Sequence, residues 1–136
     1  MYLREWDGES SMTVKTILLA DDEASLRFLL TETLADEGYA LSEAEDGRQA
    51  KEWLEAETFD LVILDYMMPE LTGVEVCEWL RGSASPNRDI PVILLTAKAL
   101  EKDKERAKAA GITSYIVKPF SPLQLIDDVG KLLGDG

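Results

Sequence analysis

The sequence Leu61-Val62-Ile63-Leu64-Asp65 consists of four apolar residues followed by one acid, and it is the clearest structural signal in the chain. A short run that is apolar at every position is typical of a central strand in a parallel sheet, because helices cover both faces of such a strand. Segments with helical periodicity precede and follow this run, as in βαβ units. Residues 60–64 are therefore predicted to form the central strand of an α/β domain.

Three further apolar runs also end on a charged or hydroxyl-bearing side chain. Ile17-Leu18-Leu19-Ala20 leads into Asp21-Asp22-Glu23, Val92-Ile93-Leu94-Leu95 leads into Thr96, and Tyr115-Ile116-Val117 leads into Lys118-Pro119. In an open parallel sheet the carboxyl ends of all strands lie along one edge, where ligands bind. The sequence therefore predicts one pocket that holds three carboxylates, a hydroxyl and an ammonium group.

Strand-like and helix-like segments alternate five times along the chain. The predicted strands cover 16–20, 39–43, 60–64, 90–95 and 113–117, and the predicted helices cover about 25–37, 47–56, 73–81, 100–110 and 121–133. This alternation predicts an α/β fold with a doubly wound, five-stranded parallel sheet and five helices on both of its faces. Residues 1–14 are expected to be an N-terminal extension that precedes a domain at 15–134.

The helices at 25–37 and 100–110 are each expected to bury a particular set of apolar residues. The apolar stripe of the helix at 25–37 consists of Leu26, Leu29, Leu30 and Leu34. The helix at 100–110 is charged all the way round except for a seam of Leu100, Ala107 and Ala110. Taken alone, this pattern favours a solvated surface helix. The functional interpretation is a weakly anchored helix that can shift, because little apolar surface holds it.

Composition excludes several classes of function. Twenty-seven acids against fourteen bases give a net charge of -13, which argues against direct binding of nucleic acid or of an anionic membrane by this domain. There is no histidine, so a histidine-based triad, an imidazole metal site and a phosphohistidine carrier are excluded.

The expected location is the cytoplasm. No apolar run approaches the ~20 residues that a membrane span requires, and the N-terminus lacks the apolar centre of a signal peptide. Cys77 is the single cysteine and is predicted to be a buried structural thiol, which suits a reducing compartment.

Asp21, Asp22 and Asp65 would repel one another if they shared a pocket. Like charges ~4 Å apart cost on the order of 4 kcal/mol at an effective dielectric constant near 20. A pocket with oxygen ligands and no histidine or cysteine favours Mg²⁺, or Mn²⁺, as the neutralising ion. The alternative for residues 21–23 is capping of the following helix, but Asp65 at the end of another strand favours the cation site.

Asp65 is the candidate nucleophile, because a carboxylate can attack a phosphoryl group to give an aspartyl phosphate. Lys118 can supply a cation to one phosphoryl oxygen, and Thr96 can donate a hydrogen bond to another. Taken singly, Thr96 could be an ordinary strand-end residue and Lys118 a surface lysine. The convergence of all four strand ends favours the functional interpretation.

Across residues 15–134 the chain resembles the response-regulator receiver domains of two-component signalling. The matching strings are Ile17-Leu18-Leu19-Ala20-Asp21-Asp22-Glu23, Leu64-Asp65-Tyr66-Met67-Met68-Pro69, Leu95-Thr96-Ala97 and Tyr115-Ile116-Val117-Lys118-Pro119-Phe120. The resemblance implies strand order 2-1-3-4-5. It also implies that Asp65 takes a phosphoryl group from a histidine kinase or a phosphotransfer protein.

The same resemblance implies roles for individual residues. Mg²⁺ would be held by Asp22, Asp65 and the backbone carbonyl of Met67, with Asp21 acting largely through water. Thr96 and Tyr115 would form a switch in which the phosphate draws the hydroxyl inward and the ring turns into the vacated space. The bond between Lys118 and Pro119 is expected to be cis.

The expected function is thus a signalling switch and not an enzyme with a separate substrate. Its output surface would consist of the helix at 100–110, the strand at 113–117 and the helix at 121–133, and a dimer formed on phosphorylation is a further expectation. Met67 is apolar, and Lys98 places a cation at the pocket rim, so the lifetime of the phosphorylated state stays open. The chain could be a stand-alone regulator or the receiver of a longer protein, and its downstream target is also open.

Two other functions compete with this interpretation. A hydrolase or mutase that forms an aspartyl phosphate would usually place a second acid two residues after the nucleophile, and Met67 occupies that position. A flavin-binding, flavodoxin-like protein would need Ser, Thr or Gly after the first strand, where this chain has three acids.

Overall fold

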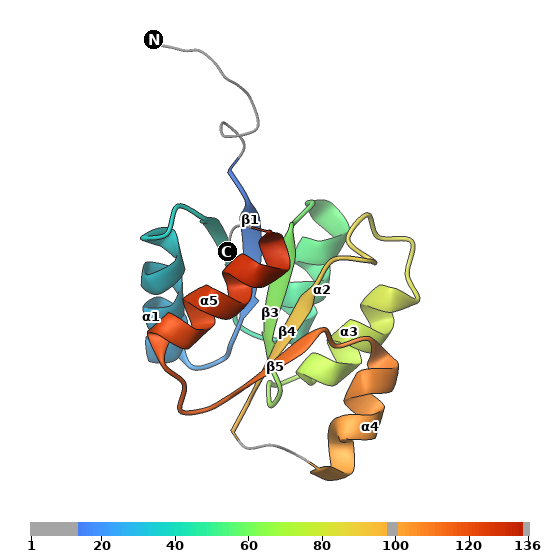
Figure 1. Ribbon diagram of the computed structural model, residues 1–136. Coiled ribbons are helices and arrows are strands. Elements are labelled where there is room, and N and C mark those ends of the chain that lie inside the picture. The colour runs from blue at the N-terminus through green and yellow to red at the C-terminus, as the bar shows by residue number, and fades with distance from the viewer. Residues whose placement is uncertain (1–13, 98–100, 135–136) are drawn as a thin grey trace.

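The computed structural model describes residues 14–97 and 101–134, which form alternating strands and helices (Figure 1). The strands are β1 (Thr16–Ala20), β2 (Ala40–Ala44), β3 (Leu61–Asp65), β4 (Val92–Thr96) and β5 (Ser114–Val117). The helices are α1 (Ala24–Ala35), α2 (Gly47–Ala56), α3 (Gly73–Arg81), α4 (Glu101–Ala110) and α5 (Pro122–Leu133). All the predicted elements are present. The predicted extension at 1–14 lies outside the described residues except for Val14.

The five strands form one parallel sheet in the order β2-β1-β3-β4-β5. This order is the one that the family resemblance implies. Every residue of β3 and of β4 is buried, because helices cover the sheet on both sides and these two strands lie away from its edges. The predicted doubly wound sheet with a central strand at 60–64 is confirmed.

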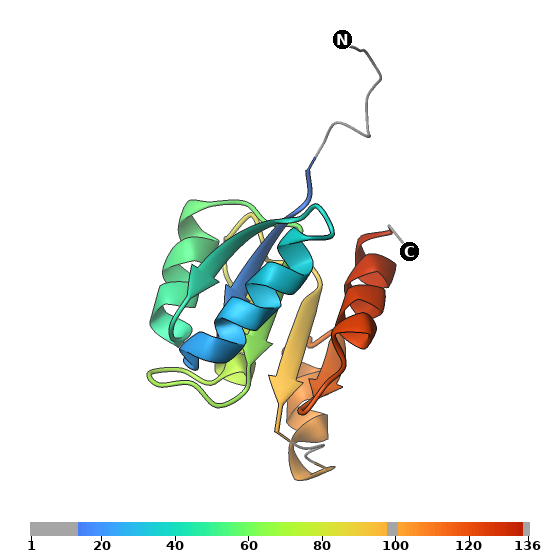
Figure 2. The ribbon, with the colours of Figure 1, turned by 90° about the vertical axis from the view of Figure 1, so that its left-hand side faces the viewer.

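Alternate residues of each strand face opposite sides of the sheet and build two separate cores. One core joins α1 and α5 to the sheet through Ile17, Leu19, Leu61, Ile63, Ile93 and Leu95. The other joins α2, α3 and α4 to it through Leu18, Ala20, Val62, Leu64, Val92 and Leu94. In Figure 2, α5 accordingly lies on one side of the sheet and α2 on the other.

Side-chain caps begin three of the helices at the carboxyl edge of the sheet. Asp46 accepts a hydrogen bond from the Gln49 amide before α2, and Ser121 accepts one from the Gln124 amide before α5. Thr72 begins α3 with a capping box. Each cap satisfies an amide that the first turn of a helix leaves unpaired.

The predicted apolar stripe of α1 is only partly correct. Leu30 and Leu34 are buried, but Leu29 is 47% exposed, so the prediction that Leu29 faces inward is wrong. Phe28 is also exposed. Apolar residues occur on more than one side of this helix, so their spacing does not define a single buried face.

Helix α4 contacts the rest of the molecule through small side chains. Ala107 and Ala110 are buried as predicted, whereas Leu100 lies outside the described residues. Arg106 forms a two-bond ion pair with Glu78 of α3, with N···O distances of 3.1 and 3.0 Å. The sequence did not predict this contact between helices.

Cys77 of α3 is buried, as predicted. Its thiol donates a hydrogen bond to the Ala110 carbonyl over 3.2 Å, and burial raises the pKa of Cys77 to about 11. The thiol therefore joins α3 to the end of α4. Among the described residues, no helix combines the length and the apolar character that crossing a bilayer requires.

Candidate functional site

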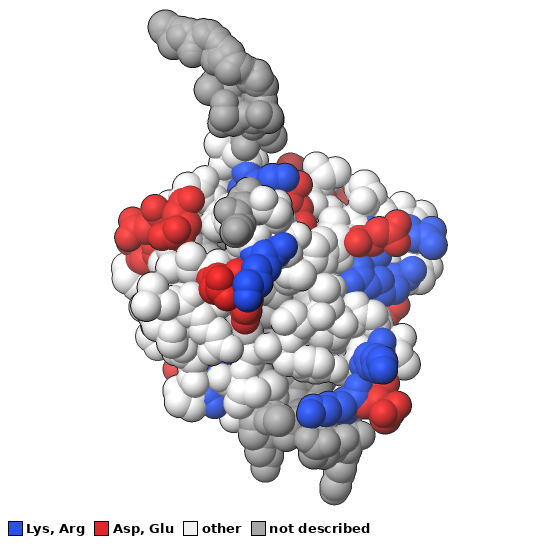
Figure 3. Space-filling model, viewed as in Figure 1, with Lys and Arg blue, Asp and Glu red and all other residues white. Residues whose placement is uncertain are grey.

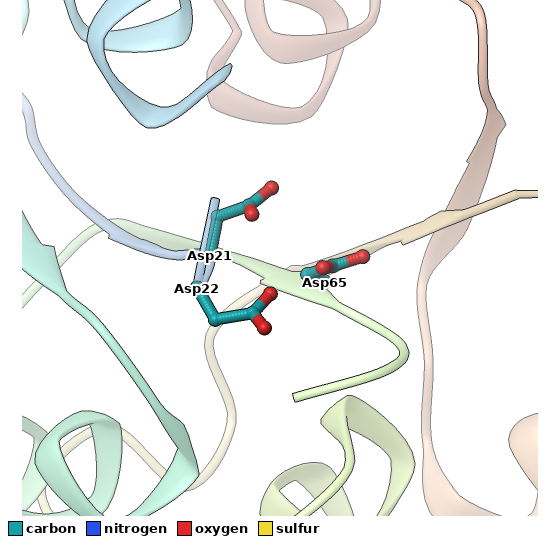
Figure 4. Close-up of side chains that lie close together, drawn as sticks. All are labelled: Asp21, Asp22 and Asp65. Atoms are coloured by element: carbon teal, nitrogen blue, oxygen red, sulfur yellow. The ribbon is translucent and has the colours of Figure 1, made fainter. Parts of the chain in front are cut away.

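Three carboxylates meet at the carboxyl edge of the sheet. Asp21 and Asp22 follow β1, and Asp65 is the last residue of β3. One oxygen from each carboxylate lies within 4.8 Å of the others, and Figure 4 shows the three side chains side by side. Asp21 is 0% exposed and Asp65 is 5% exposed, whereas Asp22 is exposed. The structure therefore brings together the three acids that the sequence placed in one pocket.

Among the described residues, one carboxylate oxygen of Asp21 has no hydrogen-bond partner. Its amide donates to the Ala44 carbonyl over 3.1 Å, and its Oδ1 accepts from the Glu23 amide over 2.8 Å. Its Oδ2 is buried and accepts no hydrogen bond from the described residues, and Lys118 Nζ lies 3.9 Å from it. Burial raises the pKa of Asp21 to about 6, and the neighbouring Asp65 carboxylate adds to the rise.

Lys118 reaches Asp65 from the loop that follows β5. Its Nζ donates a hydrogen bond to Asp65 Oδ1 over 3.0 Å. Burial raises the pKa of the Asp65 carboxyl, and the Lys118 ammonium group opposes that rise. One ammonium group faces three carboxylates here, so the pocket keeps a surplus of acidic groups.

Thr96 lies next to these groups at the end of β4 and is 3% exposed. Its carbonyl accepts a hydrogen bond from the Lys118 amide over 2.7 Å. The predicted hydroxyl and ammonium residues therefore stand on adjacent strand ends. The bond between Lys118 and Pro119 is cis, as the resemblance implies.

Tyr115 and Met67 are more exposed than the buried acids Asp21 and Asp65. Tyr115 pairs with Leu94 across the sheet and is 37% exposed. Met67, in the loop at 66–72 between β3 and α3, is 66% exposed. The roles of the Tyr115 ring and of the Met67 carbonyl stay predictions, and Lys98 lies outside the described residues.

Two glycines hold the loop at 66–72 close to its neighbours. The Gly73 amide donates to the Tyr66 carbonyl over 2.9 Å, and a Cβ at Gly73 would lie 2.6 Å from the Asp65 carbonyl oxygen. A Cβ at Gly47 would lie 2.5 Å from the Leu71 carbonyl oxygen. These separations are shorter than any ordinary contact, so only glycine allows this approach.

Arg27 is a residue of this site that was not predicted from the sequence. Its Nη1 donates to the Asp21 carbonyl over 2.6 Å, and its Nε donates to Glu43 Oε1 over 3.0 Å. The only signal in the sequence is a basic residue in the first turn of the helix after the acidic run. Many helices begin in this way, so that signal does not identify a functional residue.

The residues of the pocket fit a hard divalent cation. They offer carboxylate oxygens from Asp21, Asp22 and Asp65, and one of these oxygens is buried with no hydrogen-bond partner in the described part of the chain. Mg²⁺ prefers oxygen ligands and neutralises clustered carboxylates. Two open hollows of about 330 and 390 Å³ lie along α2 and include none of these residues, so the chemistry points to the acidic edge instead.

Comparison with known proteins gives a consistent result. The family model for the response regulator receiver domain matches residues 17–130. The transcriptional regulatory protein ResD of Bacillus subtilis is 45% identical over 118 residues, which cover 86% of this chain and 47% of that protein. The chain thus spans about half the length of this relative.

Solved structures agree on the fold. The receiver domain of the Pseudomonas aeruginosa sensor histidine kinase PA1611, which has a magnesium ion in its active-site cleft, is 30% identical with a TM-score of 0.81. That alignment covers 90% of this chain and 99% of the other. The Vibrio cholerae chemotaxis response regulator CheY4 is 34% identical with a TM-score of 0.83, covering 89% of this chain and 100% of the other.

The sheet order, the acidic cluster beside a lysine and the matches in sequence and structure all lead to one conclusion. This chain belongs to the response regulator receiver domain family.

Proposed function

We propose that this receiver domain accepts a phosphoryl group on Asp65 from the phosphohistidine of a histidine kinase or of a phosphotransfer protein. The observation that carries the proposal is the 3.0 Å contact between Lys118 Nζ and Asp65 Oδ1 beside the other two acids. Lys118 Nζ lies 3.0 Å from Asp65 Oδ1 but 3.9 Å from Asp21 Oδ2. Asp65 lies at the pocket and against the lysine, which makes it the best placed nucleophile.

The proposed transfer forms a bond between an Asp65 oxygen and phosphorus. It breaks the bond between phosphorus and an imidazole nitrogen of the donor, and that nitrogen keeps the electron pair and takes a proton from water. Catalysis of such a transfer depends mainly on positioning and on stabilising negative charge. The Lys118 ammonium group and the Thr96 hydroxyl would supply that stabilisation.

The proposed cation site consists of Asp22, Asp65 and the backbone carbonyl of Met67, with Asp21 acting largely through water. Bound Mg²⁺, or Mn²⁺, would neutralise the carboxylates and the charge of the transferring group. The buried Asp21 Oδ2, which accepts no hydrogen bond within residues 14–97 and 101–134, supports this assignment. A cation or an ordered water is the natural partner for such an atom.

The proposed output surface comprises α4, β5 and α5. Thr96 ends β4 at the pocket, and Tyr115 lies on the neighbouring strand with a partly exposed ring. We propose that the phosphate attracts the Thr96 hydroxyl and that the Tyr115 ring then turns inward. Such a change would alter the affinity of this surface for a partner protein or for a second copy of the chain.

Exposed apolar side chains near the pocket support a protein donor. Phe28 and Leu29 of α1 are 66% and 47% exposed, and Leu123 at the start of α5 is 77% exposed. Both helices begin shortly after pocket residues, and they lie side by side in the structure (Figure 1). We propose that the phosphohistidine donor covers these exposed apolar side chains of α1 and α5 while its imidazole faces Asp65.

We further propose that the domain acts in the cytoplasm as a switch and not as an enzyme with a separate substrate. Its chemistry is directed at its own Asp65, and Cys77 is a free thiol, which suits a reducing compartment. Direct binding of nucleic acid by this domain is not expected, because the net charge is -13.

The test of the proposed function is incubation of the whole chain with Mg²⁺ and acetyl phosphate, followed by intact mass measurement. We expect one added phosphoryl group on the wild type, none on Asp65→Asn and none when EDTA replaces Mg²⁺. Asp127→Asn is the matched control, because Asp127 is exposed and pairs with Lys131 on α5, and it should be modified like the wild type. Equal modification of Asp65→Asn and wild type would contradict the proposal.

A further inference from the structure

We infer that Arg27 is a positioning residue for the cation site, an inference that rests on the proposed function. Arg27 lies in the first turn of α1, and its side chain is only 14% exposed. Its Nη1 donates to the backbone carbonyl of Asp21 over 2.6 Å. The guanidinium group therefore contacts the turn that presents the acids and not the acids themselves.

The bonded carbonyl belongs to the peptide plane that joins Asp21 to Asp22. Fixing this plane fixes the direction in which the Asp22 side chain leaves the backbone. The Asp22 side chain is exposed, so its position depends strongly on the backbone from which it leaves. The neighbouring bonds from Asp21 to Ala44 and from Glu23 to Asp21 hold the other side of the turn.

Arg27 is itself held from the end of β2. Its Nε donates to Glu43 Oε1 over 3.0 Å, and the Glu43 carbonyl accepts a hydrogen bond from Trp53 Nε1 over 2.9 Å. A guanidinium group presents its donors in a rigid fork, which lets one side chain serve two acceptors in different directions. A lysine ammonium group at the same position could not serve both acceptors with this geometry.

Loss of the Arg27 charge and loss of its positioning role would change the affinity for Mg²⁺ in opposite directions. A positive charge near the acids repels a divalent cation, so its removal alone would tighten the binding of Mg²⁺. Loss of the bond to the Asp21 carbonyl would instead release the peptide plane and weaken binding. Residues that orient metal ligands typically contribute about 10–100-fold to metal affinity.

The experiment measures Mg²⁺ affinity by isothermal titration calorimetry on the whole chain. The thermal midpoint in EDTA, recorded in parallel, separates folding from binding. We expect Arg27→Met to bind Mg²⁺ about tenfold more weakly than the wild type, at the low end of the range for such residues. Arg27→Lys, which keeps the charge, should also bind more weakly.

The matched control is Arg48→Met. Arg48 also lies in the first turn of a helix that leaves the carboxyl edge, and it also pairs with a glutamate, Glu52, over 3.2 Å. This control should bind Mg²⁺ like the wild type.

The outcomes separate the inference from the proposed function. If the wild type binds no Mg²⁺, the proposed cation site fails, and the inference fails with it. If the wild type binds Mg²⁺ and folded Arg27→Met binds it equally or more tightly, the cation site stands and the positioning role is overturned. If Arg27→Met does not fold, Arg27→Lys is the deciding variant. An Mg²⁺ affinity of Arg27→Lys equal to that of the wild type then overturns the positioning role.

Discussion

Asp21 and Asp65 have raised pKa values chiefly because burial removes water from their carboxylates. β1 and β3 are inner strands of the sheet, and both acids lie at the carboxyl ends of these strands. A proton and a divalent cation are alternative ways to neutralise such a cluster. The ionisation of these residues should therefore depend on the presence of Mg²⁺.

The free energy of unfolding of the metal-free protein should contain a contribution that rises as the pH falls from about 7 to 4. The pKa of Asp21 is about 6 in the folded protein against 3.8 ordinarily, so the folded state binds this proton more tightly. The resulting stabilisation is complete below the ordinary value and is lost as the pH rises through about 6. A difference of about two pKa units corresponds to about 3 kcal/mol. Urea unfolding in EDTA at several pH values measures it.

Asp22, Asp65 and Lys118 face Asp21. The pKa of Asp65 is also raised, so Asp65 likewise adds stability to the folded protein as the pH falls. Arg106 lowers the pKa of Glu78, so the contribution of Glu78 to stability is lost as the pH falls. The difference between the wild type and Asp21→Asn therefore reports the contribution of Asp21 together with its interaction with Asp65. Parallel pH curves for the two proteins would contradict the prediction, and saturating Mg²⁺ should flatten the difference.

Gly73→Ala should lower the free energy of unfolding by about 1–3 kcal/mol, the usual cost of forcing an extra group into a packed site. The added Cβ would lie 2.6 Å from the Asp65 carbonyl oxygen and 2.7 Å from Leu94 Cδ1. Urea unfolding in EDTA measures the change. Gly82→Ala is the control, because its Cβ would meet nothing closer than 3.8 Å, and equal effects of the two substitutions would rule out the steric explanation.

At the scale of the elements, one arginine joins α3 to the turn that follows α4. Arg81 Nη2 donates to the Gly111 carbonyl over 2.7 Å, and its Nη1 donates to the Ile90 carbonyl over 2.7 Å and to the Arg88 carbonyl over 2.8 Å. The chain before β4 and the end of α4 thus share one guanidinium group. This contact compensates for the small apolar surface of α4.

Arg81→Met should lower the free energy of unfolding by about 2 kcal/mol, since it removes charged hydrogen bonds to several carbonyl groups. The amide protons of α4 and of residues 111–113 should lose more protection from hydrogen exchange than those of α1. Arg88→Met is the control, because the Arg88 side chain is exposed and only its carbonyl takes part. Uniform loss of protection across the sheet would contradict a local role for Arg81.

The elements and the pocket could be predicted from the sequence because both follow from periodic patterns. Leu61–Asp65 is apolar up to a final acid, and parallel strands bring such ends together whatever loops intervene. Leu29 was predicted wrongly, because apolar residues on several sides of α1 leave its buried face undefined. The contacts of Arg27 and Arg81 could not be predicted, since backbone carbonyl acceptors occur at every position and only the folded geometry selects among them.

At the scale of the whole molecule, the net charge is -13, yet acids and bases are mixed on the viewed surface. Figure 3 shows acidic and basic side chains in several small groups among the described residues on that face. No broad basic area is visible among them. Asp21, Asp22 and Asp65 form a local concentration of acidic groups at the edge of the sheet.

Asp65→Asn should raise the thermal midpoint of the metal-free protein and reduce its response to Mg²⁺. The raised pKa of Asp65 shows that the folded state favours the neutral carboxyl group, and an amide is neutral at every pH. In the wild type, Mg²⁺ at 100 times its dissociation constant should add about 2.7 kcal/mol to the free energy of unfolding. Thermal melts in EDTA and in Mg²⁺ measure both effects. An undiminished response of Asp65→Asn to Mg²⁺ would contradict a ligand role for Asp65.

The sheet divides the molecule into two cores that share its strands but no side chains. A substitution at Ile63 changes the packing against α1 and α5, and one at Leu64 changes the packing against α2, α3 and α4. Substitutions in one core therefore leave the packing of the other core unchanged. Insertion of one residue into β3 would move the side chains that follow it to the opposite face of the sheet and turn Asp65 away from its partners. Evolution of this domain should therefore tolerate many substitutions in the strand that ends at Asp65 but almost no change in that strand's length.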